Sequence, residues 1–191
     1  MPSKKRDHLV LTALNLFSKQ GYRATGIDTI LSVSGVAKMT LYNHFKSKDE
    51  LIIAALNKRD EDFVSWLKSA IDRLTHQQKT DPRINRLMAL FDAVDEWINS
   101  EQFYGCNFIN ASIEFKRKDD PIHVAAAAHK KLMLQILREF LSELRLQDPD
   151  AVAKQIHMVI EGAIIMAVSL GELNSAMIGK QTTLQILEPY L

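Results

Sequence analysis

Apolar residues recur every three or four positions along most of this chain, which is the spacing of one buried stripe on an α-helix. In the first segment, Leu9, Ala13, Leu16 and Phe17 share such a stripe. The 191 residues include only 7 glycines and 5 prolines, too few for the turns of an all-β chain. The pattern therefore predicts an all-α fold of about nine helices, over residues 4–20, 25–34, 37–45, 48–75, 82–99, 108–115, 121–146, 150–170 and 175–187.

Residues at the predicted helix boundaries support these limits. Thr25 with Asp28, and Ser47 with Glu50, have the spacing of capping boxes, in which each side chain binds the other residue's backbone N–H. Gly35 can take the left-handed conformation that ends the second helix. Three later helices share one start signal, an aspartate N-cap followed by proline at the first helical position: Asp81–Pro82, Asp120–Pro121 and Asp148–Pro149.

Residues 25–51 carry the functional signal. Two short amphipathic helices flank Gly35, an arrangement typical of the helix-turn-helix, which places its second helix in the DNA major groove. That second helix buries Leu41 and Phe45 and is predicted to leave five residues outward, Lys38, Met39, Thr40, Asn43 and His44. We expect a domain boundary after this unit, giving domains of residues 1–47 and 48–191.

The charge distribution favours the same end of the chain for DNA contact. Residues 1–59 hold ten Lys/Arg and four Asp/Glu, a net charge of +6, whereas the remaining 14 basic and 19 acidic residues give −5. A basic head on an acidic body suits a protein that touches a polyanion with one end only.

Other chemistry finds little support in the sequence. The single cysteine, Cys106, excludes an internal disulfide and a multi-cysteine zinc site. The six histidines form no i, i+4 pair, and no HExxH, phosphate-loop or GxSxG motif occurs. We therefore expect no enzyme activity, no metal and no cofactor.

The start of the chain does not read as a signal peptide, and the apolar stretch 162–171 is too short to span a bilayer, so a cytoplasmic protein without membrane contact is expected.

The chain resembles the tetracycline-repressor (TetR) family of bacterial transcription regulators. The framework of the family's DNA-binding head is matched by Thr25, Ile30, Gly35, Val36, Leu41, Tyr42, His44, Phe45, Lys48 and Leu51. Three positions depart from it: Ala37 replaces a serine N-cap, Met39 stands where glycine is frequent, and Leu31 replaces an alanine. These departures bear on the operator sequence rather than on the fold. The segment GCNFINASIE (105–114) also resembles a stretch found in some members.

The resemblance implies a ligand-responsive regulator, in most cases a repressor, that binds a roughly palindromic operator as a homodimer. It implies phosphate contacts from Thr25, Tyr42, His44 and Lys48, with a basic arm of Lys4, Lys5 and Arg6. The outward residues Lys38, Met39, Thr40 and Asn43 are expected to face the bases, Lys38 towards a guanine edge and Asn43 towards an adenine.

In the body, the two last helices keep more apolar surface than the core uses, which predicts a homodimer through helices eight and nine. The family likeness implies a small-molecule pocket within residues 48–191, whose binding releases DNA. The candidate lining is mostly methionine and aromatic, with two carboxylates, and consists of Phe63, Trp66, Met88, Phe91, Trp97, Phe103, Cys106, Phe108, Glu114, Met133, Phe140, Met158, Glu161 and Ile165.

Several alternatives stay open at this point. The apolar candidates are also what an ordinary helical core would contain, and either carboxylate is also compatible with a purely structural role. Cys106 allows a thiol-based sensor of oxidants or electrophiles, although an inert buried cysteine is the commoner case. A helical adaptor whose head contacts proteins instead of DNA is the remaining class.

Overall fold

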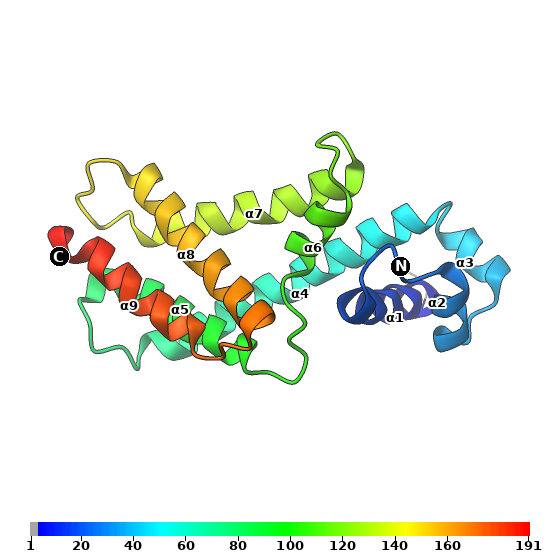
Figure 1. The fold of residues 1–191 in the computed structure, drawn as a ribbon, viewed down its shortest axis with the longest axis horizontal. Helices are drawn as coiled ribbons and strands as arrows, with labels where there is room; N and C mark the ends of the chain where they lie inside the picture. Colours follow the sequence, from blue (N-terminus) through cyan, green and yellow to red (C-terminus); the bar gives the residue numbers. More distant parts are fainter. Residues whose placement is uncertain (1–3) are drawn as a thin grey trace. The chain divides into compact units, whose positions relative to one another are not determined.

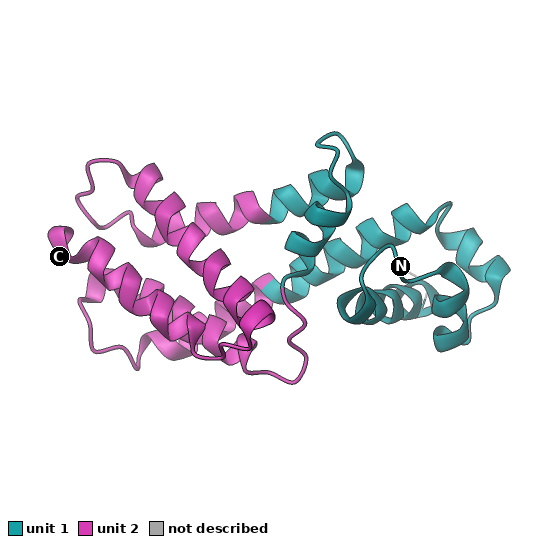
Figure 2. Cartoon of the chain, viewed as in Figure 1, with its two compact units in different colours: residues 1–63, 106–129 teal, residues 64–105, 130–191 magenta. Residues whose placement is uncertain are grey.

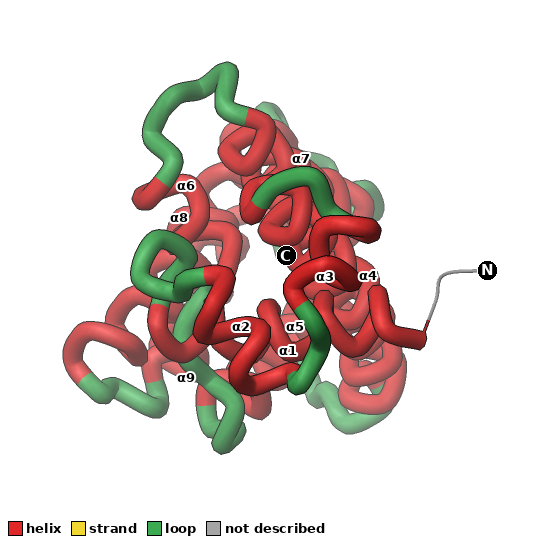
Figure 3. Tube along the Cα trace, turned by 90° about the vertical axis from the view of Figure 1, so that its right-hand side faces the viewer, coloured by secondary structure: helices red, strands yellow, loops and turns green. Residues whose placement is uncertain are grey.

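The computed structural model describes residues 4–191, and all regular structure within that range is helical (Figures 1 and 3). The prediction of an all-α fold with nine α-helices is confirmed. The α-helices are α1 (Lys4–Gln20), α2 (Ile27–Ser34), α3 (Lys38–His44), α4 (Lys48–Thr75), α5 (Asn85–Ile98), α6 (Asn107–Glu114), α7 (Pro121–Phe140), α8 (Pro149–Leu170) and α9 (Ser175–Leu187). Two short 3-10 helices, Pro82–Ile84 and Glu188–Tyr190, precede α5 and follow α9.

The chain forms two compact units (Figure 2). Unit 1 comprises residues 1–63 and 106–129, and unit 2 comprises residues 64–105 and 130–191. The first unit thus holds α1–α3, the start of α4, α6 and the start of α7. This division does not follow the predicted boundary after residue 47, which stays a prediction for the functional domains.

The core of the head within unit 1 follows from the stripe on α1. Leu9, Ala13, Leu16 and Phe17 are all buried, as their spacing predicts. The α1 helix packs against both α2 and α3. The Tyr22 ring, just beyond the left-handed Gly21, packs against the Phe17 ring with centroids 5.1 Å apart. Burial raises the pKa of the Tyr22 phenol, so this group stays protonated.

Two predicted helix boundaries are wrong. Helix α7 ends at Phe140 instead of residue 146, and the chain turns there while still burying Leu141 and Leu144. Because these two residues are three apart, they extended the helical pattern beyond the real end. The Asp81–Pro82 signal starts the 3-10 turn Pro82–Ile84 before α5, with the Asp81 side chain accepting from the Arg83 N–H.

Capping is confirmed at some helix starts and wrong at one. Ser47 accepts a hydrogen bond from the Glu50 N–H at 3.2 Å, as the capping box at α4 predicts. The Glu50 carboxylate accepts from the Lys46 N–H at 2.8 Å, one residue before the donor that the capping box predicts. At α2 the N-cap is Gly26, without a side-chain hydrogen bond, so Thr25 is not the cap.

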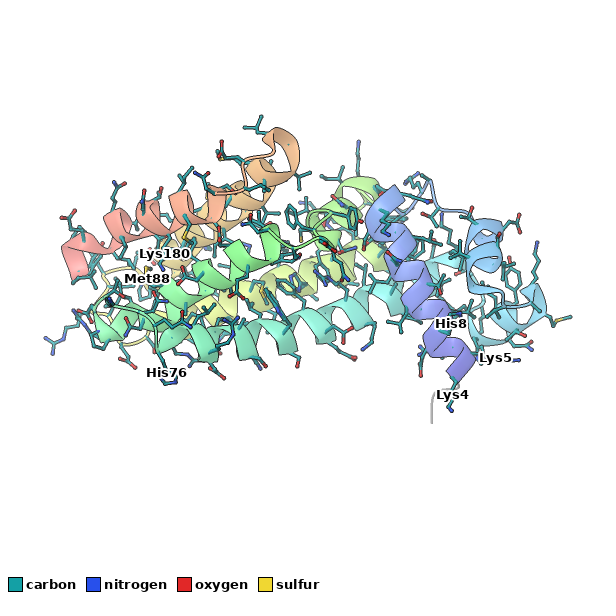
Figure 4. All side chains as sticks on the ribbon, turned by 90° about the horizontal axis from the view of Figure 1, so that it is seen from below. Lys4, Lys5, His8, His76, Met88 and Lys180 are labelled. Atoms are coloured by element: carbon teal, nitrogen blue, oxygen red, sulfur yellow. The ribbon has the colours of Figure 1, made fainter. Side chains whose placement is uncertain are left out.

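In unit 2, helix α9 packs closely on α5 and α8 at Gly179. A Cβ at this position would lie 3.1 Å from Phe91 Cε1 and from Val159 Cγ1, which is tighter than ordinary packing allows. The next residue of α9 is Lys180, which is labelled in Figure 4. Its ammonium donates to Asp92 at 2.6 Å and to Gln78 at 3.1 Å. A partly buried ion pair therefore fixes α9 against α5.

Among the described residues, one helix, α8, has the length and apolar composition to cross a membrane. The same composition serves a soluble helical core, and α8 buries seven residues in unit 2: Val152, Ala153, Ile156, Ile160, Ala163, Ile164 and Ala167. Its Glu161 is paired with Lys130 at 2.7 Å. These contacts account for part of the apolar character of α8, while Met158, Ile165, Met166, Val168 and Leu170 stay exposed in the single chain.

The α3 start yields a testable prediction. Ala37 is the N-cap, with φ −64° and ψ 143°, the extended conformation of N-cap residues, but it has no side-chain acceptor. We expect Ala37→Ser to raise the free energy of unfolding by about 1 kcal/mol, because its hydroxyl can accept from the first turn of α3. Urea denaturation measures this change. Ala24→Ser, in the exposed turn before α2, is the control and should change nothing; an equal effect of both substitutions would contradict the capping argument.

Candidate nucleic-acid interface

The helix-turn-helix forms as the sequence predicts. Helix α2 ends at Gly35, which is left-handed with φ 66° and donates its N–H to the Leu31 carbonyl oxygen at 2.9 Å. Helix α3 follows within three residues and turns Leu41 into the core. Phe45, just beyond α3, is also buried. The sharp turn and the inward residues leave the opposite side of α3 to solvent.

That outer side carries the predicted base-reading residues. Met39 is 74% exposed and Tyr42 is 45% exposed, which is unusual for large apolar and aromatic side chains. Lys38 and Asn43 are exposed as well, whereas Thr40 and His44 are half-buried. The structure thus brings together, on one short helix, donors, an amide and an apolar side chain suited to base edges and thymine methyl groups.

Lys38 lies near an acidic neighbour on α2. Its Nζ atom is 3.7 Å from Asp28 Oδ1, and the two side chains are 64% and 90% exposed. A solvent-exposed ion pair of this kind contributes at most about 1 kcal/mol. The Lys38 ammonium can therefore leave Asp28 for a guanine edge or a phosphate at little cost.

Lys4, Lys5 and Arg6 do not form an arm in the structure. All three belong to the first turn of α1, and Figure 4 shows Lys4 and Lys5 at that end of the helix. The Arg6 guanidinium lies over the Phe45 ring, 5.3 Å from its centroid. The predicted arm is instead the first turn of α1, and the phosphate contacts of these residues stay a prediction.

The start of α4 holds Lys48, another predicted phosphate contact. Its ammonium donates to the Arg23 carbonyl oxygen at 3.3 Å, and burial lowers the pKa of Lys48. This lysine therefore joins the α1–α2 loop to α4 and is not simply a surface charge. Phosphate binding at this position would use the N-terminus of α4 together with the ammonium.

The structure contradicts the predicted phosphate contact through the Thr25 side chain. Thr25 is fully buried, and its hydroxyl donates to the Gly21 carbonyl oxygen at 2.8 Å. The residue closes the α1–α2 loop from inside. Sequence matching to a family position cannot distinguish this role from a surface role.

One contact of the head was missed by sequence reasoning. His8 Nε2 lies 3.0 Å from the Ser34 carbonyl oxygen and links α1 to the last turn of α2. The two residues are 26 positions apart, so no local spacing rule identifies this pair.

The candidate effector residues are distributed over both units. Unit 1 holds Phe63, Cys106, Phe108 and Glu114, and unit 2 holds Trp66, Met88, Phe91, Trp97, Phe103, Met133, Phe140, Met158, Glu161 and Ile165. Met158 is 72% exposed and Ile165 is 44% exposed, so neither lines an interior in this chain. Their assignment to a pocket within one chain is therefore wrong.

The two candidate carboxylates have structural partners. Glu114 accepts hydrogen bonds from the Tyr22 and Arg23 N–H groups, which removes it from the predicted effector contacts. Glu161 binds Lys130, and His157 Nε2 lies 3.9 Å from the same oxygen. Burial lowers the pKa of His157, an effect that Lys130 reinforces and Glu161 opposes. Glu161 thus belongs to a partly buried charged cluster in unit 2.

Cys106 is buried, with 6% of its surface exposed. Although no lysine or arginine is near it in sequence, Arg59 of α4 is close enough to interact electrostatically with the Cys106 side chain. Burial lowers the pKa of the Arg59 guanidinium. Burial restricts the access of reagents to the thiol, so the thiol-sensor hypothesis gains a cationic neighbour but loses accessibility.

A second buried polar group in unit 1 is His129. Its Nδ1 atom lies 2.5 Å from Asp60 Oδ1, and its ring stacks on Phe108 with centroids 3.6 Å apart. The sequence alone assigns no role to His129. Within residues 4–191, no group of three histidine, cysteine or acidic side chains is arranged to hold a metal ion.

Comparison with known proteins identifies two matching family models. Residues 9–55 match the model of bacterial regulatory proteins of the tetR family, and residues 84–177 match a tetracyclin repressor-like C-terminal domain. The chain is 28% identical over 166 residues to the HTH-type transcriptional activator FasR of Mycolicibacterium smegmatis, covering 86% of this chain and 69% of that protein. It is 24% identical over 160 residues to the HTH-type transcriptional regulator YjdC of Escherichia coli, covering 84% and 81%.

A solved structure agrees over the whole chain. SCO4454, a TetR-family transcriptional regulator from Streptomyces coelicolor, superposes with a TM-score of 0.85 at 27% identity, covering 100% of this chain and 91% of that one.

The buried position of Thr25 gives a prediction that separates packing from DNA contact. Thr25→Val keeps the shape but leaves the Gly21 carbonyl oxygen without its donor, so we expect the free energy of unfolding to fall by about 1 kcal/mol. Because the hydroxyl is buried and bonded to Gly21, we expect the slope of log affinity against log salt concentration not to change. Lys48→Ala is the comparison and should reduce that slope by about one unit. An equal loss of slope in Thr25→Val would restore the phosphate contact.

Proposed function

Because the chain belongs to the tetR family of bacterial regulatory proteins, we propose that this DNA-binding transcriptional regulator is a cytoplasmic repressor. In this proposal it binds a roughly palindromic operator as a homodimer and leaves it when a small-molecule effector binds. Family members are regulators and not enzymes, so catalysis is not part of the function. The observation that carries the proposal is the exposed side of α3, where Lys38, Met39 and Asn43 project beside a basic α1 terminus.

Two kinds of contact would share the binding free energy. Lysine and arginine side chains with helix N-termini would neutralise phosphates, which supplies most of the affinity and makes it strongly salt-dependent. The side chains of α3 would then select the sequence, with Lys38 on guanine and Asn43 on adenine. Met39 adds an apolar contact for a thymine methyl group, and its 74% exposure supports this role.

Exposed apolar residues on and beside α8 and α9 support the homodimer. These side chains are at least about one-third exposed in the single chain: Met158, Ile165, Met166, Val168, Leu170, Leu173 and Ile178. Exposed apolar side chains gathered on two successive elements often mark an association site. A two-fold axis through it would present two copies of α3 to two half-sites.

Effector release follows from linkage. A ligand that binds preferentially to the DNA-incompetent state weakens operator binding by its difference in affinity for the two states, and by no more. Half-buried Phe103 and Met133 are the candidates best placed to meet such a ligand without unpacking the core. The buried candidates Met88 and Phe91 would line it only after the surrounding helices move.

DNA selection from a random pool tests the proposal directly. We expect the purified protein to enrich a palindromic sequence and to bind it roughly 1,000-fold or more tightly than random DNA at physiological salt. Fluorescence anisotropy over a salt series measures both affinities. Equal affinity for selected and random DNA would contradict sequence-specific regulation.

Small molecules that release the labelled operator in the same assay would identify the effector. Transcription in vitro would distinguish repression from activation.

Substitutions on the apolar surface test the dimer. Ile165→Glu combined with Ile178→Glu would place two charges where we propose desolvated contact, so we expect monomers in sedimentation velocity and loss of operator binding. Val124→Glu is the matched control, because Val124 is 53% exposed on α7 and lies outside this surface. A double variant that stays dimeric would place the dimer interface elsewhere.

A further inference from the structure

The short helix α6 is joined directly to the loop between α1 and α2 within unit 1. The Glu114 carboxylate accepts from the Tyr22 N–H at 2.9 Å and from the Arg23 N–H at 2.7 Å, one oxygen for each donor. In return, Arg23 Nε donates to the Glu114 carbonyl oxygen at 3.0 Å. Three hydrogen bonds thus connect residues that are 91 or 92 positions apart.

The other end of α6 is held by the same loop. The Tyr22 hydroxyl donates to the Asn107 carbonyl oxygen at 3.1 Å, and the Asn107 amide donates to Ser18 Oγ at 2.7 Å. Tyr22 therefore contacts the first and the last residue of α6 with its hydroxyl and its backbone N–H. Because the eight-residue helix is fixed at both ends, it cannot rotate or slide against α1 without breaking these bonds.

Glutamate is an unfavourable choice for the last residue of a helix. The C-terminal end carries partial negative charge, so a carboxylate there lowers helix stability unless other groups compensate. Two charge-assisted bonds to backbone N–H groups provide that compensation. The loop is shaped to accept it, since Gly21 has φ +87° and a Cβ at this position would lie 3.1 Å from Glu114 Oε1. These features indicate a built contact between α6 and the head.

The clamped loop leads directly into the DNA-binding helices. Arg23 lies three residues before Gly26, the N-cap of α2, and its carbonyl oxygen accepts from Lys48 at the start of α4. A displacement of α6 would therefore be carried by Arg23 to both α2 and α4. We propose that Glu114 is a positioning residue for operator binding, which holds α6 to the α1–α2 loop and thereby sets where each copy of α3 meets its half-site.

This inference rests on the proposed dimeric operator binding. It adds that Glu114 couples the position of α6 to that of the recognition helix. A rigid attachment restricts the separation of the two recognition helices, so the wild-type protein should prefer one half-site spacing. A loosened attachment should allow several spacings and weaken binding only at the preferred one. A general loss of stability would instead weaken binding at every spacing alike.

The experiment measures affinity for operators whose half-sites are separated by the selected spacing or by one or two base pairs more or fewer. For Glu114→Ala we expect about tenfold weaker binding at the selected spacing, equivalent to roughly 1.4 kcal/mol, with little change at the others. Glu114→Gln keeps the size and one acceptor oxygen, so it should retain part of the preference. Glu61→Ala removes an exposed carboxylate from α4 and should keep the wild-type profile.

The outcomes distinguish the positioning role of Glu114 from the dimeric operator binding on which it rests. A flattened spacing profile in Glu114→Ala, with partial recovery in Glu114→Gln, supports the positioning role. An unchanged profile, or an equal loss at all spacings in both variants, overturns it while the proposed function stands. If Glu114→Ala does not fold, as judged by circular dichroism, the Glu114→Gln profile decides alone. A wild-type protein that binds every spacing equally would overturn the dimeric operator model on which the inference rests.

Discussion

The recognition helix α3 depends on two buried side chains. Seven residues are too few for a stable isolated helix, because helices below about 12 residues are marginal in water. Its N-cap, Ala37, contributes no side-chain hydrogen bond. The helix therefore owes its existence to the burial of Leu41 and Phe45 against the core that α1 organises. Because so few side chains anchor α3, most of its surface stays available for the proposed DNA contact. The position of α3 in turn depends on how α1 and α2 pack.

Periodicity was sufficient for most of the fold. The stripe on α1, the turn at Gly35 and the limits of α4 and α9 follow from local spacing and capping chemistry, which are readable in sequence. The wrong helix boundaries came from local sequence patterns that a helix and a turn can share. Leu141 and Leu144 satisfy helical spacing but lie in a turn, and a threonine before a helix reads as a cap although Thr25 bonds back to Gly21.

Only those site residues were predictable from the sequence that lie on the outward face of a helix whose buried face is known. Lys38, Met39 and Asn43 were placed correctly, since an inward Leu41 fixes which side of α3 faces out. Glu114, His8 and His129 were misjudged or missed because their partners lie 91, 26 and 69 positions away. Such contacts depend on tertiary packing, and a single sequence carries no local sign of them. Whether the exposed residues of α3 contact DNA stays a prediction.

The attachment of α6 to the loop after α1 also limits how modular this regulator is. The family model for the head ends at residue 55, yet Asn107 and Glu114 hold Tyr22 and Arg23 in place. A chimaera that transfers only the N-terminal 55 residues to a related body would leave those partners behind. Head exchange between relatives should therefore succeed only when the incoming body supplies an equivalent acceptor at the end of its own sixth helix. The proposed operator preference would then depend on two separated segments of one gene.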